Sequence, residues 1–329
     1  MKNIGNRIAK ALVLGAAVLG ISAPLAAAQA QANWPERAVK IIVPYPPGGT
    51  ADVLGRLMAE RLTETLKQSV IVENRPGAGG AIGAAAVARA APDGYTLLMA
   101  TIASHSIIPA IGTVPYDPIA DFQPVVNVAD TPNVLLVNVD TPYKSLADIL
   151  AAARAKPGAI TFGSTSLGGS PHMSGELLKS MAGVDLLHVP YKGGGPMLTD
   201  LIGGQVQLGF DNLPSSMPHI RSGKVRPIAV TTPERWPDAP EIPTIAEAGV
   251  PGYEVAAWFG ILAPAGTPKP VVELLHRSSA EILKEPAFEK RLLELGAKPS
   301  GITPEQFSAM LERELGKWRE VAAKNGLKL

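Results

Sequence analysis

Two glycine-rich segments of this sequence have residue types that suit the binding of an anion. Residues 46–52 read PPGGTAD, and residues 163–172 read GSTSLGGSPH. Each segment lies between a run with strand character and a run with helical spacing of apolar residues. The first turn of a helix presents N–H groups without intrahelical partners and a partial positive charge, so it suits a carboxylate or a phosphate. Glycine at such a turn lets the backbone approach a ligand closely.

We therefore expect ligand contacts from both segments, which would hold the two ends of one anionic molecule. The candidate residues are Gly48, Gly49 and Thr50 in the first segment and Ser164, Thr165, Gly169 and Ser170 in the second. For each segment taken alone, glycines that only form a turn are the alternative. Two more polar residues follow predicted strands. Ser104 is a candidate to line the same cleft, and Asp211 is a candidate to accept a hydrogen bond, to meet a ligand ammonium group or to cap the next segment.

The patterns of other ligand and catalytic sites are incomplete. Residues 77–83 resemble a dinucleotide fingerprint, but Ile82 occupies the position of its third glycine, and residues 191–195 (YKGGG) lack the ending of a P-loop. The five His residues lie far apart without metal-ligand spacing, and there is no Cys and no Gly-x-Ser-x-Gly elbow. We expect no cofactor, no metal ion and no catalytic activity.

Strands and helices are predicted to alternate along most of the chain. Strands are expected at residues 39–45, 70–73, 96–101, 133–137, 160–163, 186–189, 207–210 and 225–230. Helices are expected at residues 51–67, 81–90, 271–283, 288–295 and 304–323, with two more that start at the cap residues Ser145 and Ser170. This alternation favours an α/β fold with parallel sheets covered on both faces.

The length of 329 residues predicts two domains, because a single core rarely grows this large. We expect the chain to cross between them near residues 128–132 and 255–264. Domain one would then be discontinuous, formed by residues 33–130 and 255–329, and domain two would comprise residues 131–254.

Residues 1–32 have the features of a cleaved signal peptide. Lys2, Arg7 and Lys10 are followed by a small and apolar run at residues 11–21 and by two Ala-Gln-Ala motifs. The apolar run is much shorter than the roughly 20 residues needed to span a bilayer. Without this segment the chain has 27 Lys and Arg against 29 Asp and Glu. The nearly neutral remainder gives no reason to expect nucleic acid as a partner. From the cleaved signal peptide we expect a protein that is free in the periplasm.

Six segments in order along the mature chain carry a family resemblance. They are residues 34–35 (WP), 42–52 (IVPYPPGGTAD), 72–80 (VENRPGAGG), 90–98 (AAPDGYTLL), 189–194 (VPYKGG) and 258–268 (WFGILAPAGTP). Together they resemble the substrate-binding receptors of tripartite tricarboxylate transporters, the Bug/TctC family, over essentially the whole mature chain.

The resemblance implies a two-lobed periplasmic binding protein of type II, the Venus-flytrap fold, with a mostly parallel sheet flanked by helices in each lobe. It implies a small organic carboxylate as the ligand and integral-membrane transporter subunits as partners, and we expect a monomer. Carried over by motif, the binding residues are Tyr45, Gly48, Gly49 and Thr50 in domain one and Ser164, Thr165, Gly169 and Ser170 in domain two, with Ser104 and Asp211 nearby.

Other functions share some of these features. A carboxylate-sensing receptor that feeds a signalling system would have the same export signal, lobes and anion loops, and it stays open. A periplasmic hydrolase would need a nucleophile with a base in reach, for which there is no sequence signature. A structural protein of the envelope would not need two glycine-rich anion loops.

Overall fold

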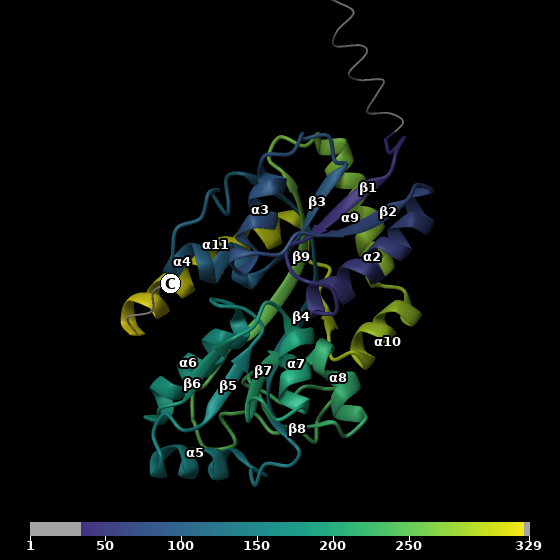
Figure 1. Ribbon diagram of the computed structural model, residues 1–329. Coiled ribbons are helices and arrows are strands. Elements are labelled where there is room, and N and C mark those ends of the chain that lie inside the picture. The colour runs from purple at the N-terminus through teal and green to yellow at the C-terminus, as the bar shows by residue number, and fades with distance from the viewer. Residues whose placement is uncertain (1–33, 326–329) are drawn as a thin grey trace, which may run out of the picture.

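The computed structural model describes residues 34–325, which form two lobes connected by long strands (Figure 1). The upper lobe in Figure 1 contains both ends of the described chain, coloured purple to blue and green to yellow, and the lower lobe contains the middle of the chain, coloured teal. The predicted signal peptide, residues 1–32, lies outside the described residues.

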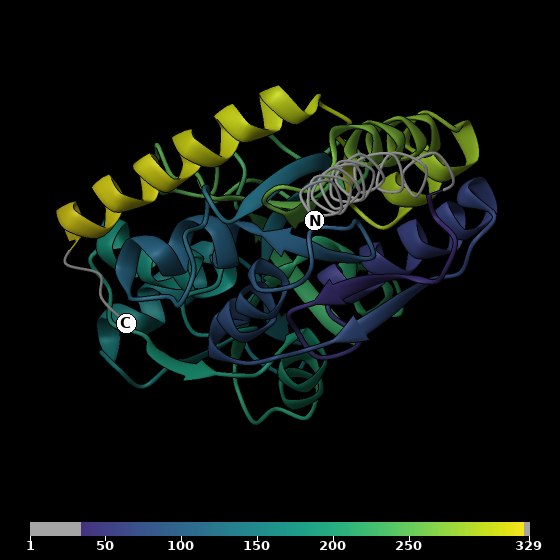
Figure 2. The same cartoon turned by 90° about the horizontal axis from the view of Figure 1, so that it is seen from above.

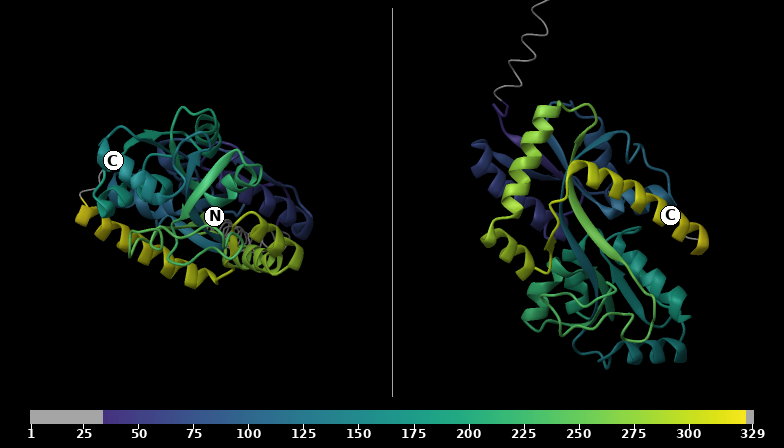
Figure 3. Two further views of the ribbon diagram at one scale, coloured as in Figure 1. Left: turned by 90° about the horizontal axis from the view of Figure 1, so that it is seen from below. Right: turned by 180° about the vertical axis from the view of Figure 1, so that it is seen from behind.

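The first lobe is built on a sheet whose first three strands are parallel. Its elements are β1 (Val39–Val43), α2 (Thr50–Leu66), β2 (Val70–Asn74), α3 (Ala81–Ala88), β3 (Thr96–Thr101), β9 (Ala256–Pro264), α9 (Lys269–Leu283), α10 (Pro286–Glu294), β10 (Lys298–Pro299) and α11 (Pro304–Asn325). In α2 the buried residues Leu54, Met58 and Leu62 recur every four positions, which gives the helix an apolar face against the sheet. Seen from above and from behind, α11 lies along one side of the molecule and, with α9, covers the back of this lobe (Figures 2 and 3).

The second lobe repeats the same alternation of strands and helices. Its elements are α5 (Leu146–Ala155), β5 (Thr161–Ser164), α6 (Ser170–Ala182), β6 (Leu187–Pro190), α7 (Gly194–Ile202), β7 (Leu208–Asn212), α8 (Leu213–Arg221) and β8 (Val225–Val230). Strands β6, β5 and β7 are parallel neighbours. The predicted cap of α5 is present: the Ser145 hydroxyl accepts from the Asp148 N–H, and the Asp148 carboxylate accepts in return from the Ser145 N–H.

One long strand, β4 (Phe122–Asn138), belongs to both sheets. It pairs antiparallel with β9 as far as Pro132 and then with β7 and β8 from Asn133 onward. The strand order is therefore β2-β1-β3-β9-β4 in the first lobe, with β10 on β4, and β6-β5-β7-β4 in the second, with β8 on β4. In the first sheet β9 and β10 oppose the direction of the other strands, and in the second sheet β4 opposes the rest, so each sheet is mixed but has one dominant direction.

The crossings between the lobes are strands that lie side by side. The β4–β9 ladder ends where Pro132 pairs with Ala256, within the two stretches in which we expected the chain to cross. The domain limits at residues 130 and 255 stay a prediction. The strand predicted at residues 133–137 is the last part of a strand of 17 residues. Its register with β9 shifts near Pro124 and Asn127, and such bulges allow a strand to contain a proline, which cannot donate to the ladder.

Some elements differ from the prediction. Helices α7 and α8 and strand β9 were not predicted, and the cap of α6 is Gly169, with Ser170 as the first helical residue. Among the described residues there is no helix with both the length and the apolar character required to span a membrane.

Candidate functional site

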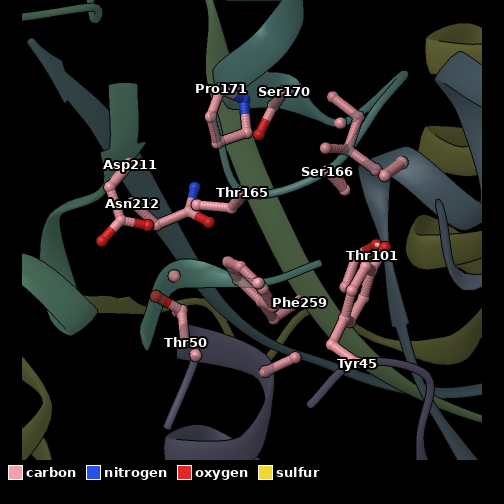
Figure 4. A pocket seen from close by; sticks show the side chains of 17 residues that line it. Tyr45, Thr50, Thr101, Thr165, Ser166, Ser170, Pro171, Asp211, Asn212 and Phe259 are labelled. Atoms are coloured by element: carbon pink, nitrogen blue, oxygen red, sulfur yellow. Dashed lines mark hydrogen bonds between the residues drawn. The ribbon is translucent and has the colours of Figure 1, made fainter. Parts of the chain in front are cut away.

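A pocket lies between the two lobes, at the ends of several strands (Figure 4). It is lined by Tyr45, Gly49, Thr50, Ala51, Thr101, Ile102, Ala103 and Phe259 from the first lobe and by Thr165, Ser166, Gly169, Ser170, Pro171, Gly193, Gly194, Asp211 and Asn212 from the second. The cavity volume of the pocket, measured with a water-sized sphere, is about 40 Å³. A pocket at the carboxyl ends of parallel strands is the usual ligand position in an open α/β sheet.

The amino ends of four helices meet at this pocket. Their N-caps are Gly49 for α2, Gly169 for α6, Gly193 for α7 and Asn212 for α8, and none of the four caps its helix with a side-chain hydrogen bond. The first turns of these helices therefore lack a side-chain cap, although Pro171 in α6, Pro196 in α7 and Pro214 in α8 have no N–H group to offer. The lining, which comes from the described residues, contains no Lys or Arg. The positive potential in the pocket thus comes from helix ends and backbone amides.

The start of α2 is held by a charged cluster behind the pocket. The Asp52 carboxylate accepts from the Gly48 N–H at 3.0 Å, from Arg56 Nε at 3.0 Å and from Asn74 Nδ2 at 2.9 Å. Burial acts to raise the pKa of Asp52, but these hydrogen bonds and the Arg56 charge outweigh it and lower the pKa below its usual 3.8. The Gly48 amide is thus engaged, while Gly49 and Thr50 face the pocket.

Tyr45 and Thr101 form the polar floor of the pocket in the first lobe. The Tyr45 hydroxyl donates to the Gly79 carbonyl at 3.0 Å and lies 2.8 Å from Thr101 Oγ1. Burial raises the pKa of Tyr45 to about 12, so its hydroxyl stays neutral. Ser104 is fully buried behind Thr101, where its hydroxyl accepts from the Thr101 N–H at 3.1 Å.

A chain of hydroxyl groups connects the two lobes and ends on Asp211. Thr50 Oγ1 donates to Ser215 Oγ at 3.1 Å, and Ser215 Oγ donates to Asp211 Oδ2 at 2.7 Å. Ser216 Oγ donates to the same oxygen at 2.8 Å. Burial raises the pKa of Asp211 from 3.8 to about 6, although these hydrogen bonds oppose the rise. Because Thr50 and Ser215 belong to different lobes, this hydrogen bond joins the two lobes directly.

Asn133, where β4 passes from one sheet to the other, anchors two residues of the pocket. Its Oδ1 accepts from Ser170 Oγ at 3.2 Å and from Asn212 Nδ2 at 2.6 Å, and its Nδ2 donates to Ser174 Oγ at 2.9 Å. Since an amide oxygen only accepts, the Ser170 hydroxyl proton is directed away from the pocket. The Ser170 hydroxyl proton is therefore engaged by Asn133.

The structure brings most of the predicted residues together. Tyr45, Gly49, Thr50, Thr165, Gly169, Ser170 and Asp211 line one pocket. Three others lie behind it, where their polar groups bond to other protein groups: Gly48 with Asp52, Ser104 with Thr101, and Ser164 with His188. The role of each as a ligand contact stays a prediction.

Sequence reasoning missed several lining residues. Gly193 and Gly194 follow strand β6 in a run of three glycines, which is the same signal that identified the first two loops. Asn212 and Phe259 lie in strands, where no glycine-rich turn marks them as candidates. Residues 34–325 contain no group of three or more His, Cys, Asp or Glu placed to hold a metal ion.

Two α/β lobes around a pocket of helix ends, with close structural neighbours of the same kind, define a two-lobed periplasmic binding protein. The chain belongs to the TctC family, because the model of the "Tripartite tricarboxylate transporter family receptor" matches residues 54–327. Members of this family and the solved neighbours are solute-binding receptors. The predicted family, fold class and absence of enzymatic function are confirmed on that ground.

Individual relatives are similar over nearly their whole length. Protein BugT of Bordetella pertussis (strain Tohama I) is 38% identical over 95% of both chains. The structure of Rpa4515 of R. palustris with adipate has a TM-score of 0.87 and 44% identity, covering 90% of this chain and 99% of that one. MatC (Rpa3494) from Rhodopseudomonas palustris with bound malate has a TM-score of 0.83 and 34% identity, covering 88% and 99%.

Proposed function

We propose that this receptor binds a small organic carboxylate in the pocket between its lobes and delivers it to a tripartite tricarboxylate transporter. The observation that carries the proposal is the convergence of four helix amino ends on one pocket whose lining has no basic side chain. The relatives support the chemical class of the ligand, because two similar receptors have been solved with adipate and with malate.

The energetics of this arrangement suit moderate affinity. A helix end contributes about 0.3–1 kcal/mol to a nearby anion, and up to about 2 when partly buried. A hydrogen bond to a charged group contributes about 1.5–3 kcal/mol. Two helix ends with two or three such hydrogen bonds therefore account for micromolar binding, about −8 kcal/mol, without an ion pair.

Ligand access requires the lobes to open. In the described conformation Thr50 bonds to Ser215 across the lobes, and a pocket of about 40 Å³ has room for about three water molecules. The crossing strands β4 and β9 are the elements about which the lobes would turn. Small-angle scattering is expected to show a larger radius of gyration without a bound acid than with one.

We place the protein in the periplasm after removal of residues 1–32. The basic start and short apolar run support export, and the family consists of periplasmic receptors. Mass spectrometry of a periplasmic extract is expected to give an amino terminus near residue 31 or 33. An intact Met1 in the membrane fraction would contradict this.

Isothermal titration of the mature protein against mono-, di- and tricarboxylates tests the binding step. We expect at least one small carboxylate to bind with a micromolar Kd, and the amides of the same acids not to bind. Uptake of that radiolabelled acid by cells with and without the receptor gene tests delivery. Unchanged uptake with a changed transcriptional response to the acid would favour the sensing function instead.

A further inference from the structure

Two histidines hold the two ends of the loop at residues 164–170, which we call the second loop. It supplies Thr165, Ser166, Gly169 and Ser170 to the pocket. At its start, Ser164 Oγ lies 2.7 Å from His188 Nε2, and near its end the Gly168 N–H donates to His172 Nδ1 at 3.0 Å. Neither histidine lines the pocket itself.

The two imidazole rings form one packed unit. They are stacked with their centroids 4.0 Å apart and an interplanar angle of 21°. The ring of the fully buried Phe162 also packs against His188, with its centroid at 4.8 Å. His172 comes from α6 and His188 from β6, so the unit ties the second loop to the helix that follows it and to the strand that pairs with β5.

Both rings are held in the neutral form. Burial lowers the pKa of each, to about 3 for His188, where the neighbouring His172 and Lys179 add to the effect. Glu176 Oε1, 3.9 Å from His172 Nε2, acts in the opposite direction without reversing it. A neutral His172 is required by its hydrogen bond, because Nδ1 accepts from Gly168 only when it carries no proton.

Gly168 is the point of the loop that most needs such an anchor. Its φ of +72° lies in the left-handed region, which places a sharp turn directly before Gly169 and Ser170. The hydrogen bond from its N–H to His172 fixes this turn, and the contact of Ser164 with His188 fixes the other end.

We propose that His172 and His188 are positioning residues that set the ligand affinity of the second loop through one ring nitrogen each, Nδ1 of His172 and Nε2 of His188. The inference rests on the proposed function, since it takes the second loop to contact the bound acid. It assigns a role to two side chains that lie outside the pocket and carry no charge.

The two nitrogens allow a reciprocal test. Asparagine has its polar atoms on Cγ, as Nδ1 is in histidine, whereas glutamine extends to the position of Nε2. His172→Asn and His188→Gln should keep the two contacts, and His172→Gln and His188→Asn should lose them. If each position required only a side chain of a given size, the same residue, Asn or Gln, would be tolerated better at both 172 and 188.

The first readout needs no ligand. Amide hydrogen exchange of residues 165–170 in the ligand-free protein should stay near the wild-type rate in His172→Asn and His188→Gln. It should rise about tenfold in His172→Gln and His188→Asn. Thermal unfolding of all four variants, with His219→Gln on α8 as the control, establishes that each is folded. Equal exchange in the Asn and Gln variants at either position would overturn the proposal.

The second readout is the Kd for adipate and for malate. For an acid that the wild type binds, the two contact-losing variants should bind about tenfold more weakly and the two contact-keeping variants within about twofold of wild type. An unchanged Kd in all four would overturn the effect on affinity. Failure of the wild type to bind any carboxylate would instead count against the proposed function, while the exchange measurement would still decide the role of the histidines.

Discussion

The two glycine-rich loops that face each other across the pocket look alike in sequence but are held in different ways. The first, residues 46–52, is held by a charged cluster in which Asp52 joins the Gly48 N–H to Arg56. The second, residues 164–170, is held by neutral groups: His172, His188 and Asn133. Similar glycine signals therefore give similar backbone sites, while the stabilising groups differ: a carboxylate of the loop itself in the first, and side chains of neighbouring elements in the second.

The difference also affects what each loop offers to an anion. In the first loop, Thr50 and Ala51 open α2 and both have an N–H group. In the second, Pro171 follows Ser170 and has no N–H, so α6 offers one amide fewer in its first turn. We infer that the first loop makes the stronger contact with a carboxylate, and the predictions below test this comparison.

The largest effect is expected at Gly49. An added Cβ there lies 4.0 Å from the Gly194 N–H nitrogen across the pocket, so the extra methyl groups of Gly49→Val occupy the space of the ligand. Loss of about two charge-assisted hydrogen bonds should weaken carboxylate binding about 100-fold, measured by titration calorimetry. Lys192→Ala, which removes an exposed cation next to the pocket, should change the Kd less than about threefold. A larger loss of affinity in Lys192→Ala than in Gly49→Val would place the site at Lys192.

Asn133 should have the next largest effect, because it anchors the second lobe's side of the pocket. Asn133→Leu leaves Ser170 and Asn212 without their shared acceptor. We expect binding about tenfold weaker and a loss of about 2 kcal/mol in the free energy of unfolding. Asn127→Leu, on the same strand but away from the pocket, is the matched control and should lower stability without changing the Kd. Equal affinity losses in both variants would contradict the anchoring role.

The two loops should respond differently to acid. The depressed pKa of His188 means that its contribution to stability is complete above pH 6.5 and is lost as the pH falls from 6.5 toward 3, because the unfolded chain binds the proton first. The pKa of Asp52 is also lowered, so its contribution to stability is present above about pH 3.8 and is lost only below that pH. Between pH 7.5 and 5, urea unfolding should show that wild type loses about 1 kcal/mol more than His188→Gln, after allowance for solvent screening. Asp52→Asn should show no such difference in this range.

The smallest effect is expected at Asp211. Its pKa of about 6 leaves it mostly ionised at pH 7.5 and mostly protonated at pH 5. With no basic residue in the lining, the carboxylate repels an anionic ligand at the higher pH. Asp211→Asn should therefore bind adipate about threefold more tightly than wild type at pH 7.5 and equally at pH 5. Weaker binding of the variant at both values would show that Asp211 accepts a hydrogen bond from the ligand.

The parts of the fold that follow local rules could be predicted from the sequence. The cap at Ser145, the amphipathic pattern of α2 and the glycine turns at Gly49 and Gly169 each depend on residues a few positions apart. The extent of β4 could not be predicted, because Pro124 and Pro132 disfavour a strand that long-range pairing nevertheless extends. Helix α7 was missed because its N-cap Gly193, its first two residues Gly194 and Gly195, and Pro196 resemble a loop.

The residues that hold the pocket in shape were also beyond sequence reasoning. Asn133 and Asn212 lie 79 positions apart, and both strands hold other polar residues, so nothing in the sequence points from one to the other. The contact between Thr50 and Ser215 spans 165 positions. Such pairs become visible only when the fold is assembled, whereas the backbone amides they position follow directly from the glycine loops.

A structure of the mature protein with its bound acid tests the central claim most directly. We predict that the carboxylate oxygens lie within hydrogen-bonding distance of backbone N–H groups at the starts of α2, α6 and α7, directly or through one water molecule, with no Lys or Arg within 4 Å. A carboxylate paired with Lys192 or another basic side chain, or an acid bound outside the pocket between the lobes, would contradict it.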